Sequence, residues 1–326
     1  MAFTASGCFV TPIDHGRYSA AAYLRDGPQT AVLETTDVTP VTTNPTPRLP
    51  VTVDSVRYGP VTVTDVSRII AVDISGTLGS IVFALGLGPN AVGRDVPTSF
   101  PSAVGLPVVT NRGHSLDAEA VLSLDPTVVL VNESTVPAKA VDQIHDSGIP
   151  VVVFPASRDL DSNDTLMRSV AQALGVPDAG EKLVARTNAQ IDAARELVPD
   201  PSGDPTMAFL YIRGSNLLLL AGPGSGVDDL IAELGGKDAG AEADLTGAFT
   251  VVTAEAMISA DPDVIIVMTQ GAATVGGPDG VLRLPGIAET EAGRHRRIVQ
   301  MDETKILAFG PDVGLVLAAL AKAIYV

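Results

Sequence analysis

Cysteine is almost absent from this chain of 326 residues. Cys8 is the only one, so neither an intramolecular disulfide nor a cysteine-rich metal site can form within the chain. Any metal must therefore be held by His, Tyr, Met or carboxylate side chains, and the chain has only 4 histidines.

Positive charge is also scarce. The sequence has 21 Lys and Arg against 38 Asp and Glu, which gives a net charge of −17. A surface of that sign repels a phosphate backbone, and no basic stretch forms a nucleic-acid footprint. Nucleic acid is therefore excluded as a partner.

Long apolar runs and enzyme signatures are lacking as well. Residues 313–326 are shorter than the ~20 apolar residues of a membrane-spanning helix and contain Lys322. There is no nucleophile elbow, no His-Glu-x-x-His pair and no phosphate loop. The Gly-rich stretch at 222–226 fails the dinucleotide fingerprint, because Val227 stands where glycine is required. Composition nevertheless supports a folded protein of about two domains, since 46% of residues are hydrophobic and the mean hydropathy is +0.30.

The start of the chain suggests an attachment. Residues 5–8, Ala-Ser-Gly-Cys, have the form of a bacterial lipoprotein processing site. Only seven residues precede Cys8, without a basic or a full apolar segment, so we expect the natural start to lie upstream; a chance cysteine is the alternative. Residues 9–50 are rich in Thr and Pro without periodicity, and they predict a flexible tether over 1–50. Behind a lipidated Cys8, such a tether would hold a folded protein at a membrane surface.

One helix–strand unit occurs twice. Residues 116–131 read LDAEAVLSLDPTVVLV, and residues 252–267 read VTAEAMISADPDVIIV. In each copy an Asp-Pro step ends an amphipathic helix, and a β-branched run then predicts a strand buried on both faces. Such strands belong to parallel sheets covered by helices, so the repeat predicts two similar α/β lobes. Asp117 and Thr253 stand at the N-cap positions, and the acids of these helix starts are interpreted as structural.

The remaining pattern completes this organisation. An alternating stretch at 51–64 predicts a hairpin around a Gly-Pro turn. Apolar positions return at helical spacing over residues 164–175 and again over residues 177–198. The second run is about 22 residues long, and it predicts a stiff connection between the lobes. The fold class is thus α/β: two similar lobes with mainly parallel sheets, joined by a long connecting helix, with a ligand cleft between them. The predicted divisions are a tether, an N-terminal lobe, a connecting helix and a C-terminal lobe: 1–50, 51–162, 163–200 and 201–326.

Two residues stand where such a cleft would place them. His114 lies in a loop at the head of the first repeat helix, and Tyr211 lies at the carboxyl end of a strand, where ligands collect in parallel sheets. An imidazole from one lobe and a phenolate from the other would make a six-coordinate ferric haem. Arg213 shares the strand face of Tyr211, and its charge would stabilise the phenolate or pair with a propionate. The other histidines lie in the tail, on an amphipathic helix and in a basic surface run: His15, His145 and His295.

These residues and several motifs carry a family resemblance. From about Val51 to its end, the chain resembles the haemin-binding proteins of bacterial haem-uptake ABC importers, within the larger group of substrate-binding proteins for haem, cobalamin and ferric siderophores. The motifs are Ser67-Arg-Ile-Ile-Ala-Val, Ala84-Leu-Gly-Leu-Gly, Val92-Gly-Arg-Asp95, the two repeat units, Leu234-Gly-Gly, and above all His114 with Tyr211-Ile-Arg213.

The resemblance implies a receptor and not an enzyme. Such a receptor captures ferric haem between its lobes and delivers it to an ABC permease and its ATPase. It would be a monomer at the extracytoplasmic face of the cell membrane, held there by a lipid if Cys8 is processed. The same scaffold with a ferric siderophore or cobalamin is the alternative, and a chelatase or reductase is a third. Cationic side chains around the pocket would favour a siderophore, whereas the His and Tyr pair favours haem.

The resemblance also implies roles for single residues. His114 and Tyr211 would be the axial iron ligands, with Arg213 as the partner of the tyrosine. Met268 and Phe249 would be pocket walls, Phe249 standing where members often have a tyrosine, so that ring stacking remains without the hydroxyl.

Docking on the permease is the last implied role. Members of the family use one acid on each lobe to meet permease arginines. Glu233 on the predicted 227–234 helix fits the second lobe, whereas Ser80 stands where the first lobe would carry its glutamate.

Overall fold

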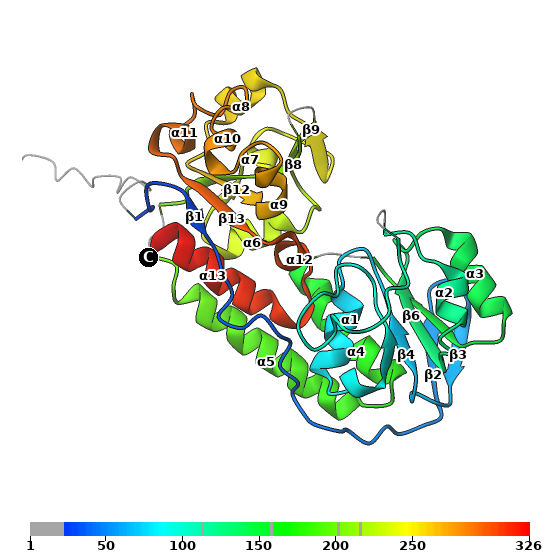
Figure 1. The fold of residues 1–326 in the computed structure, drawn as a ribbon. Coiled ribbons are helices and arrows are strands. Elements are labelled where there is room, and N and C mark those ends of the chain that lie inside the picture. Colours follow the sequence, from blue (N-terminus) through cyan, green and yellow to red (C-terminus); the bar gives the residue numbers. More distant parts are fainter. Residues whose placement is uncertain (1–22, 112–113, 157–158, 201–202, 215–216) are drawn as a thin grey trace, which may run out of the picture.

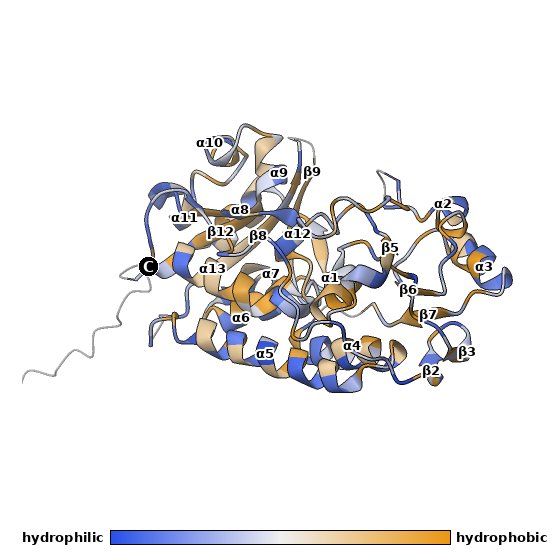
Figure 2. Cartoon of the chain, turned by 60° about the horizontal axis from the view of Figure 1, so that its bottom comes forward, coloured by the Kyte–Doolittle hydropathy of each residue, from blue (hydrophilic) through white to orange (hydrophobic). Residues whose placement is uncertain are grey.

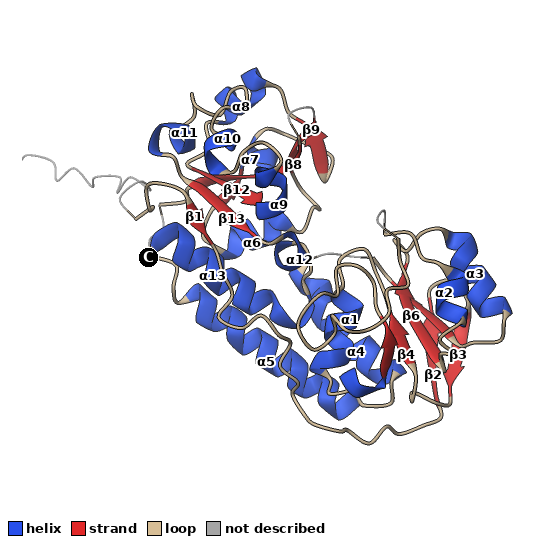
Figure 3. Cartoon of the chain, in the orientation of Figure 1, coloured by secondary structure: helices blue, strands red, loops and turns tan. Residues whose placement is uncertain are grey.

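The computed structural model describes residues 23–111, 114–156, 159–200, 203–214 and 217–326. Two α/β lobes lie side by side, and strands form a separate group in each (Figures 1 and 3). Helix α5 (Pro177–Arg195) runs beneath both lobes. The predicted fold class, two lobes with mainly parallel sheets, is confirmed. Cys8 lies outside the described residues.

The first lobe is built on a parallel sheet with the strand order β5-β4-β6-β7. Leu130 on β6 faces α1 and α4, whereas its neighbours Val129 and Val131 face α2 and α3. Both faces of the sheet are therefore buried, which explains why the strands read as continuous β-branched runs. The elements are β4 (Ile69–Ala71), α1 (Thr77–Ala84), β5 (Ala91–Gly93), α2 (Ala118–Leu122), β6 (Val128–Asn132), α3 (Ala138–Asp146), β7 (Val151–Phe154) and α4 (Leu160–Ala173).

A hairpin of β2 (Val51–Ser55) and β3 (Gly59–Val63) packs at the edge of this lobe. The predicted hairpin is present, but the prediction that Gly59 and Pro60 form its turn is wrong. The turn lies at residues 56–58, and Pro60 pairs with Asp54 within the ladder. Proline is tolerated there because a strand with only one neighbour leaves alternate amides without a ladder partner.

The second lobe has a mixed sheet in the order β1-β13-β12-β8-β9-β11, with β10 beside β8. Its central pairs are parallel, and β9 and β11 add antiparallel strands at one edge. The strands are β1 (Gln29–Thr30), β8 (Thr206–Arg213), β9 (Leu217–Ala221), β10 (Lys237–Asp238), β11 (Phe249–Val251), β12 (Val264–Met268) and β13 (Ile298–Met301). The helices are α6 (Val227–Glu233), α7 (Ala239–Glu242), α8 (Ala254–Ala260), α9 (Thr269–Ala273), α10 (Pro278–Val281), α11 (Glu291–His295), α12 (Glu303–Ile306) and α13 (Val313–Tyr325).

The repeated unit forms α2 with β6 in the first lobe and α8 with β12 in the second. Asp117 caps α2 by accepting from the amide of Ala120 at 3.1 Å, and Thr253 caps α8 by accepting from Ala256 at 3.2 Å. Asp125 and Asp261, which precede the prolines, both take left-handed backbone conformations, with φ of 45° and 37°. Aspartate tolerates this region better than most residues, so the same Asp-Pro step ends both helices. The acidic helix starts are therefore capping elements, as predicted.

Residues 23–50, which we call the strap, are packed on both lobes and do not form the flexible tether that the sequence predicts for them. β1 pairs in parallel with β13 at the edge of the second lobe. The strap then reaches the first lobe, where Val38 is buried and the amide of Val41 donates to the carbonyl of Ala84 at 2.8 Å. An extended segment needs no helical or alternating pattern when its backbone hydrogen bonds go to surfaces that are already folded. The composition of the strap therefore resembles that of a free linker.

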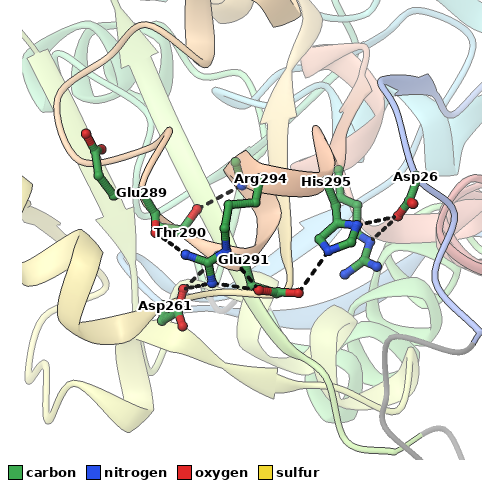
Figure 4. A network of polar contacts seen from close by, with 9 residues as sticks. Asp26, Asp261, Glu289, Thr290, Glu291, Arg294 and His295 are labelled. Carbon is green, nitrogen blue, oxygen red and sulfur yellow. Dashed lines mark hydrogen bonds and ion pairs between the residues drawn. The ribbon is translucent and has the colours of Figure 1, made fainter.

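Polar contacts fix the start of the strap on the second lobe. Asp26 accepts a hydrogen bond from Arg297 Nε at 2.9 Å and lies 3.2 Å from Nδ1 of His295. Nε2 of His295 lies 3.1 Å from Glu291, which also pairs with Arg294 (Figure 4). The hydrogen bond to His295 is the main reason why the pKa of Asp26 lies below its ordinary value. His295, expected in a plain surface run, thus links α11 to the strap.

The predicted connecting helix, 163–200, contains two helices. α4 ends at Ala173 and α5 begins at Pro177, with Gly175 in a left-handed conformation between them. α13 packs against α5 so closely that a Cβ on Gly314 would lie 2.5 Å from Cβ of Gln190. Figure 2 shows α13 as mostly hydrophobic and α5 as carrying many hydrophilic residues, as its outer position requires. Within the described ranges, no helix has both the length and the apolar character needed to span a bilayer.

Candidate ligand-binding cleft

A recess of about 470 Å³ lies between the lobes. The first lobe lines it with residues that follow its strands, and the second lobe lines it with the loop before α6 and with Phe249. The lining residues are Ile74, Ser134, Ala156, Asp159, Gly224, Ser225, Gly226, Asp228, Asp229, Ala248 and Phe249. The predicted cleft between lobes therefore exists, and the Gly-rich loop at 222–226 forms part of its wall.

Tyr211 lies near the carboxyl end of β8 and is half-buried. Its ring meets Phe249 edge-on, with 6.0 Å between ring centroids. Nε of Arg213 donates a hydrogen bond to Oη of Tyr211 at 2.9 Å, and the guanidinium carbon lies 4.9 Å from the ring centroid. The Arg213 side chain thus folds back over the tyrosine, which places a positive charge beside the phenol oxygen.

Phe249 connects this tyrosine to the cleft. It lies on β11, lines the recess, and also contacts the buried Phe209 with 6.5 Å between centroids. The three rings form a stack of edge contacts from the core to the cleft. Phe209 was not identified from the sequence, although its position two residues before Tyr211 places both on one strand face.

His114 lies on the first lobe in a tight loop. Its φ is 60°, a left-handed conformation that is uncommon for a residue with a side chain. Its amide donates to the carbonyl of Asn111 at 2.9 Å, while Thr110 and Leu116 pair across the loop. Nδ1 of the half-buried imidazole is buried without a hydrogen-bond partner among the described residues. Because Nδ1 is buried, Nε2 is left as the candidate nitrogen for an incoming ligand. Among the described contacts, none joins His114 to Tyr211.

The other two residues named from the sequence lie elsewhere. Met268 is only 1% exposed and belongs to the buried cluster against which Tyr211 and Phe249 pack, so it does not line the recess in this structure, and its role as a pocket wall stays a prediction. Its strand β12 is covered on both faces, which leaves no side of Met268 open to the cleft. Glu233 on α6 is 20% exposed and binds Arg195 of α5, with Oε1 accepting from Nη2 at 2.7 Å. The hydrogen bonding to Glu233 is the main reason why the pKa of Arg195 lies above its ordinary value.

A residue that the sequence did not reveal lies behind Arg213. Oε2 of Glu303, on α12, lies 3.2 Å from Nη1 of Arg213. Glu303 is about 90 positions later in the chain, and no local pattern links it to the Tyr-x-Arg motif. Only the pairing of β8, β12 and β13 brings the two together.

Two buried carboxylates lie at the carboxyl ends of β4 and β5. Asp73 is 4% exposed and Asp95 is fully buried. Oδ2 of Asp95 accepts from the amide of Asp73 at 2.9 Å, and Oδ2 of Asp73 accepts from the amide of Leu78 at 2.7 Å. Burial first, and then the charge of Asp73, raises the pKa of Asp95 to about 7. Asp95 ends the Val92-Gly-Arg-Asp95 motif, so this motif supplies a buried carboxylate at the carboxyl end of β5.

The donor set limits the ligand. In the part of the chain that the structure describes, no group of three or more His, Cys, Asp or Glu side chains could hold a metal ion. A single imidazole on one lobe and a single phenol on the other suit a metal that arrives with most of its ligands already attached, such as the iron of a chelate.

Several known proteins resemble this chain in sequence and fold. The protein HmuT, whose crystal structure is described as that of a heme binding protein, superposes with a TM-score of 0.84 at 37% identity, over 92% of this chain and 98% of HmuT. RhuT from Roseiflexus sp. RS-1, a periplasmic heme-binding protein in its apo form, superposes with a TM-score of 0.74 at 38% identity, over 79% of this chain and 98% of RhuT. Solved structures of HmuT include alanine variants at one histidine, at one tyrosine, and at the arginine two positions after that tyrosine.

A relative in Bacillus subtilis (strain 168) is described as the uncharacterized ABC transporter substrate-binding lipoprotein YvrC. It is 26% identical over 280 residues, which cover 85% of this chain and 86% of YvrC. The family described as periplasmic binding protein matches residues 72–304. The resemblance to substrate-binding proteins is therefore confirmed: this chain belongs to the periplasmic binding protein family, whose members here are solute-binding components of transporters.

Proposed function

We propose that this chain is the haem receptor of an ABC importer. It would capture ferric haem in the cleft between its lobes and deliver it to a permease with its ATPase. The observation that carries the proposal is the hydrogen bond from Arg213 to Tyr211 beside the cleft, in a chain that matches HmuT over 92% of its length. Ferric iron binds tyrosine through its oxygen, and the guanidinium of Arg213 places a positive charge and a hydrogen-bond donor beside that oxygen.

In this proposal the two lobes supply different ligands. Tyr211 would bind the iron from the second lobe, and His114 would bind it from the first lobe through Nε2. The variants of HmuT at a histidine, a tyrosine and an arginine support this assignment, because the residue types and the Tyr-x-Arg spacing are the same here. Phe249 would pack against the porphyrin from the cleft wall.

Glu233 would meet a permease arginine on docking. Its present partner, Arg195, carries the same guanidinium group as a permease arginine, so docking would exchange one guanidinium for another. We further propose that the protein acts at the extracytoplasmic face of the cell membrane and that Cys8 carries a lipid; the relative YvrC is described as a lipoprotein.

Titration of the apoprotein with ferric haemin tests the function. We expect one equivalent to bind with a ligated ferric Soret band, and we expect cobalamin and a ferric siderophore to leave that band unchanged when added in excess. Tighter binding of either competitor than of haemin would overturn the proposal. Among the described residues that line the recess there is neither Lys nor Arg, so the lining does not supply the cationic side chains that would favour an anionic siderophore.

A further inference from the structure

Arg213 is held by two residues from different parts of the chain. Nε donates to Oη of Tyr211 at 2.9 Å, and Nη1 lies 3.2 Å from Oε2 of Glu303. An arginine side chain has several free torsions, and a single hydrogen bond to a phenol leaves it able to turn away. The second contact fixes the plane of the guanidinium, because two of its nitrogens are then bound at once.

Glu303 is itself held in place without help from Arg213. Its amide donates to Oε1 of Gln270 at 2.9 Å, and Nε2 of Gln270 donates to Oδ2 of Asp302 at 2.7 Å. Asp302 also caps α12 by accepting from the amide of Thr304 at 2.8 Å. The carboxylate of Glu303 therefore stands on a backbone that is fixed by the side chains of Gln270, in the first turn of α9, and of Asp302, which follows β13.

The pair adds little to the stability of the fold. The side chain of Arg213 is 43% exposed and that of Glu303 is 32% exposed. Exposed ion pairs of this kind contribute about 0–1 kcal/mol. What the contact does provide is a direction for Arg213, which points along the face of β8 toward the phenol instead of into solvent.

We propose that Glu303 is a positioning residue of the binding site, which acts through Arg213 to keep the guanidinium charge beside the oxygen of Tyr211. This inference rests on the proposed function, since its effect is read through haem bound at Tyr211. Glu303 does not touch the iron or the phenol. Its removal frees Arg213 to leave Tyr211, and the phenolate then loses its nearest cation.

The experiment compares Glu303→Ala, Glu303→Gln, Arg213→Ala and the double variant Arg213→Ala/Glu303→Ala. The readouts are the absorption spectrum of the ferric haemin complex and the rate at which apomyoglobin removes the haemin. Glu303→Ala should raise that rate by about tenfold, as loss of an outer partner does, and should change the ferric bands. Glu303→Gln keeps an oxygen that can accept from Arg213, so it should restore most of the parent's behaviour. In the Arg213→Ala background, Glu303→Ala should have no further effect, because nothing remains for Glu303 to position.

Asp279→Ala is the matched control. It removes another arginine–carboxylate pair of the second lobe, that with Arg296 at 2.6 Å, away from the cleft. It should leave both readouts unchanged. The inference is overturned if Glu303→Ala matches the parent in rate and spectrum, or if its effect is undiminished in the Arg213→Ala background. Failure of the parent itself to bind ferric haemin would instead overturn the proposed function, so the two failures are distinct.

Discussion

The two lobes share a helix–strand unit but prepare their functional residues in opposite ways. In the second lobe, Tyr211 is held by Arg213 and Phe249, and Arg213 is held by Glu303. In the first lobe, the Nδ1 atom of His114 has no hydrogen-bond partner among the described residues, although the backbone of its loop is tightly bonded. Tyr211, the proposed ligand of the second lobe, is thus oriented by side-chain contacts, whereas His114, the proposed ligand of the first lobe, has a hydrogen-bonded backbone but no described hydrogen bond on Nδ1.

This difference suggests an order of binding. A pre-oriented group loses little entropy on binding, so ferric haem would bind Tyr211 first. His114 would then complete the coordination when the first lobe approaches. The repeated units, α2 with β6 and α8 with β12, are alike because each supports the sheet of its lobe. The proposed roles of the two lobes differ because the connections beside these units differ.

The largest expected effect is that of removing the oriented ligand. Tyr211→Ala should weaken the binding of ferric haemin by more than the roughly 10- to 100-fold that loss of an outer partner costs. Equilibrium titration measures this change, and Tyr325→Phe, far from the cleft on α13, is a control. Binding by Tyr211→Ala as tight as that of the parent would mean that the second lobe does not supply the main ligand.

The proposed ligand of the first lobe should matter less. His114→Ala should weaken binding by about tenfold, or ~1.4 kcal/mol, because water can replace a neutral imidazole while the phenolate stays on the iron. The same titration measures it. A loss larger than that of Tyr211→Ala would reverse the comparison between the lobes.

The strap is anchored in both lobes, so its effect should be on stability and not on the ligand. Val38→Ala removes two methyl groups from the core of the first lobe, where Val38 is 6% exposed. It should lower the free energy of unfolding by about 1–3 kcal/mol, as measured by urea unfolding. Val32→Ala, on the same strap but 69% exposed, is the matched control and should stay within about 0.5 kcal/mol of the parent. Equal effects of the two variants would show that the strap is not packed as described.

The last prediction concerns the pH dependence of stability and belongs to the first lobe. The folded protein holds a proton on Asp95, whose pKa is raised to about 7, at pH values where the unfolded carboxyl, with its ordinary pKa of 3.8, has lost it. Stability from this proton is complete below about pH 4 and is lost as pH rises through about 7. The melting temperature of the apoprotein should therefore fall between about pH 5 and pH 8. Asp73→Asn, which removes the neighbouring charge, should flatten that fall; identical slopes would contradict this account.

The elements of the fold could be predicted where local chemistry decides them. β-branched runs and the caps Asp117 and Thr253 gave the repeat units, because burial on both faces and capping are properties of short segments. The strap could not be predicted, since an extended segment carries no period and its partners, such as the carbonyl of Ala84, are distant in sequence. The burial of Met268 could not be predicted either, because a strand end does not show from its own sequence whether both of its faces are covered.

The candidate site followed the same division. His114, Tyr211 and Arg213 could be named from motif and strand end, and their roles as ligands stay predictions. Glu303 could not be named, because it reaches Arg213 only through the order of strands in the sheet.

We propose above all that ferric haem is held by one ligand from each lobe, with Tyr211 as the stronger. The most direct measurement is the absorption spectrum of the stoichiometric ferric haemin complex for the parent, His114→Ala and Tyr211→Ala. We expect a six-coordinate ferric spectrum for the parent, a phenolate-ligated spectrum without imidazole for His114→Ala, and loss of the phenolate bands for Tyr211→Ala. The parent's spectrum in both variants would contradict it.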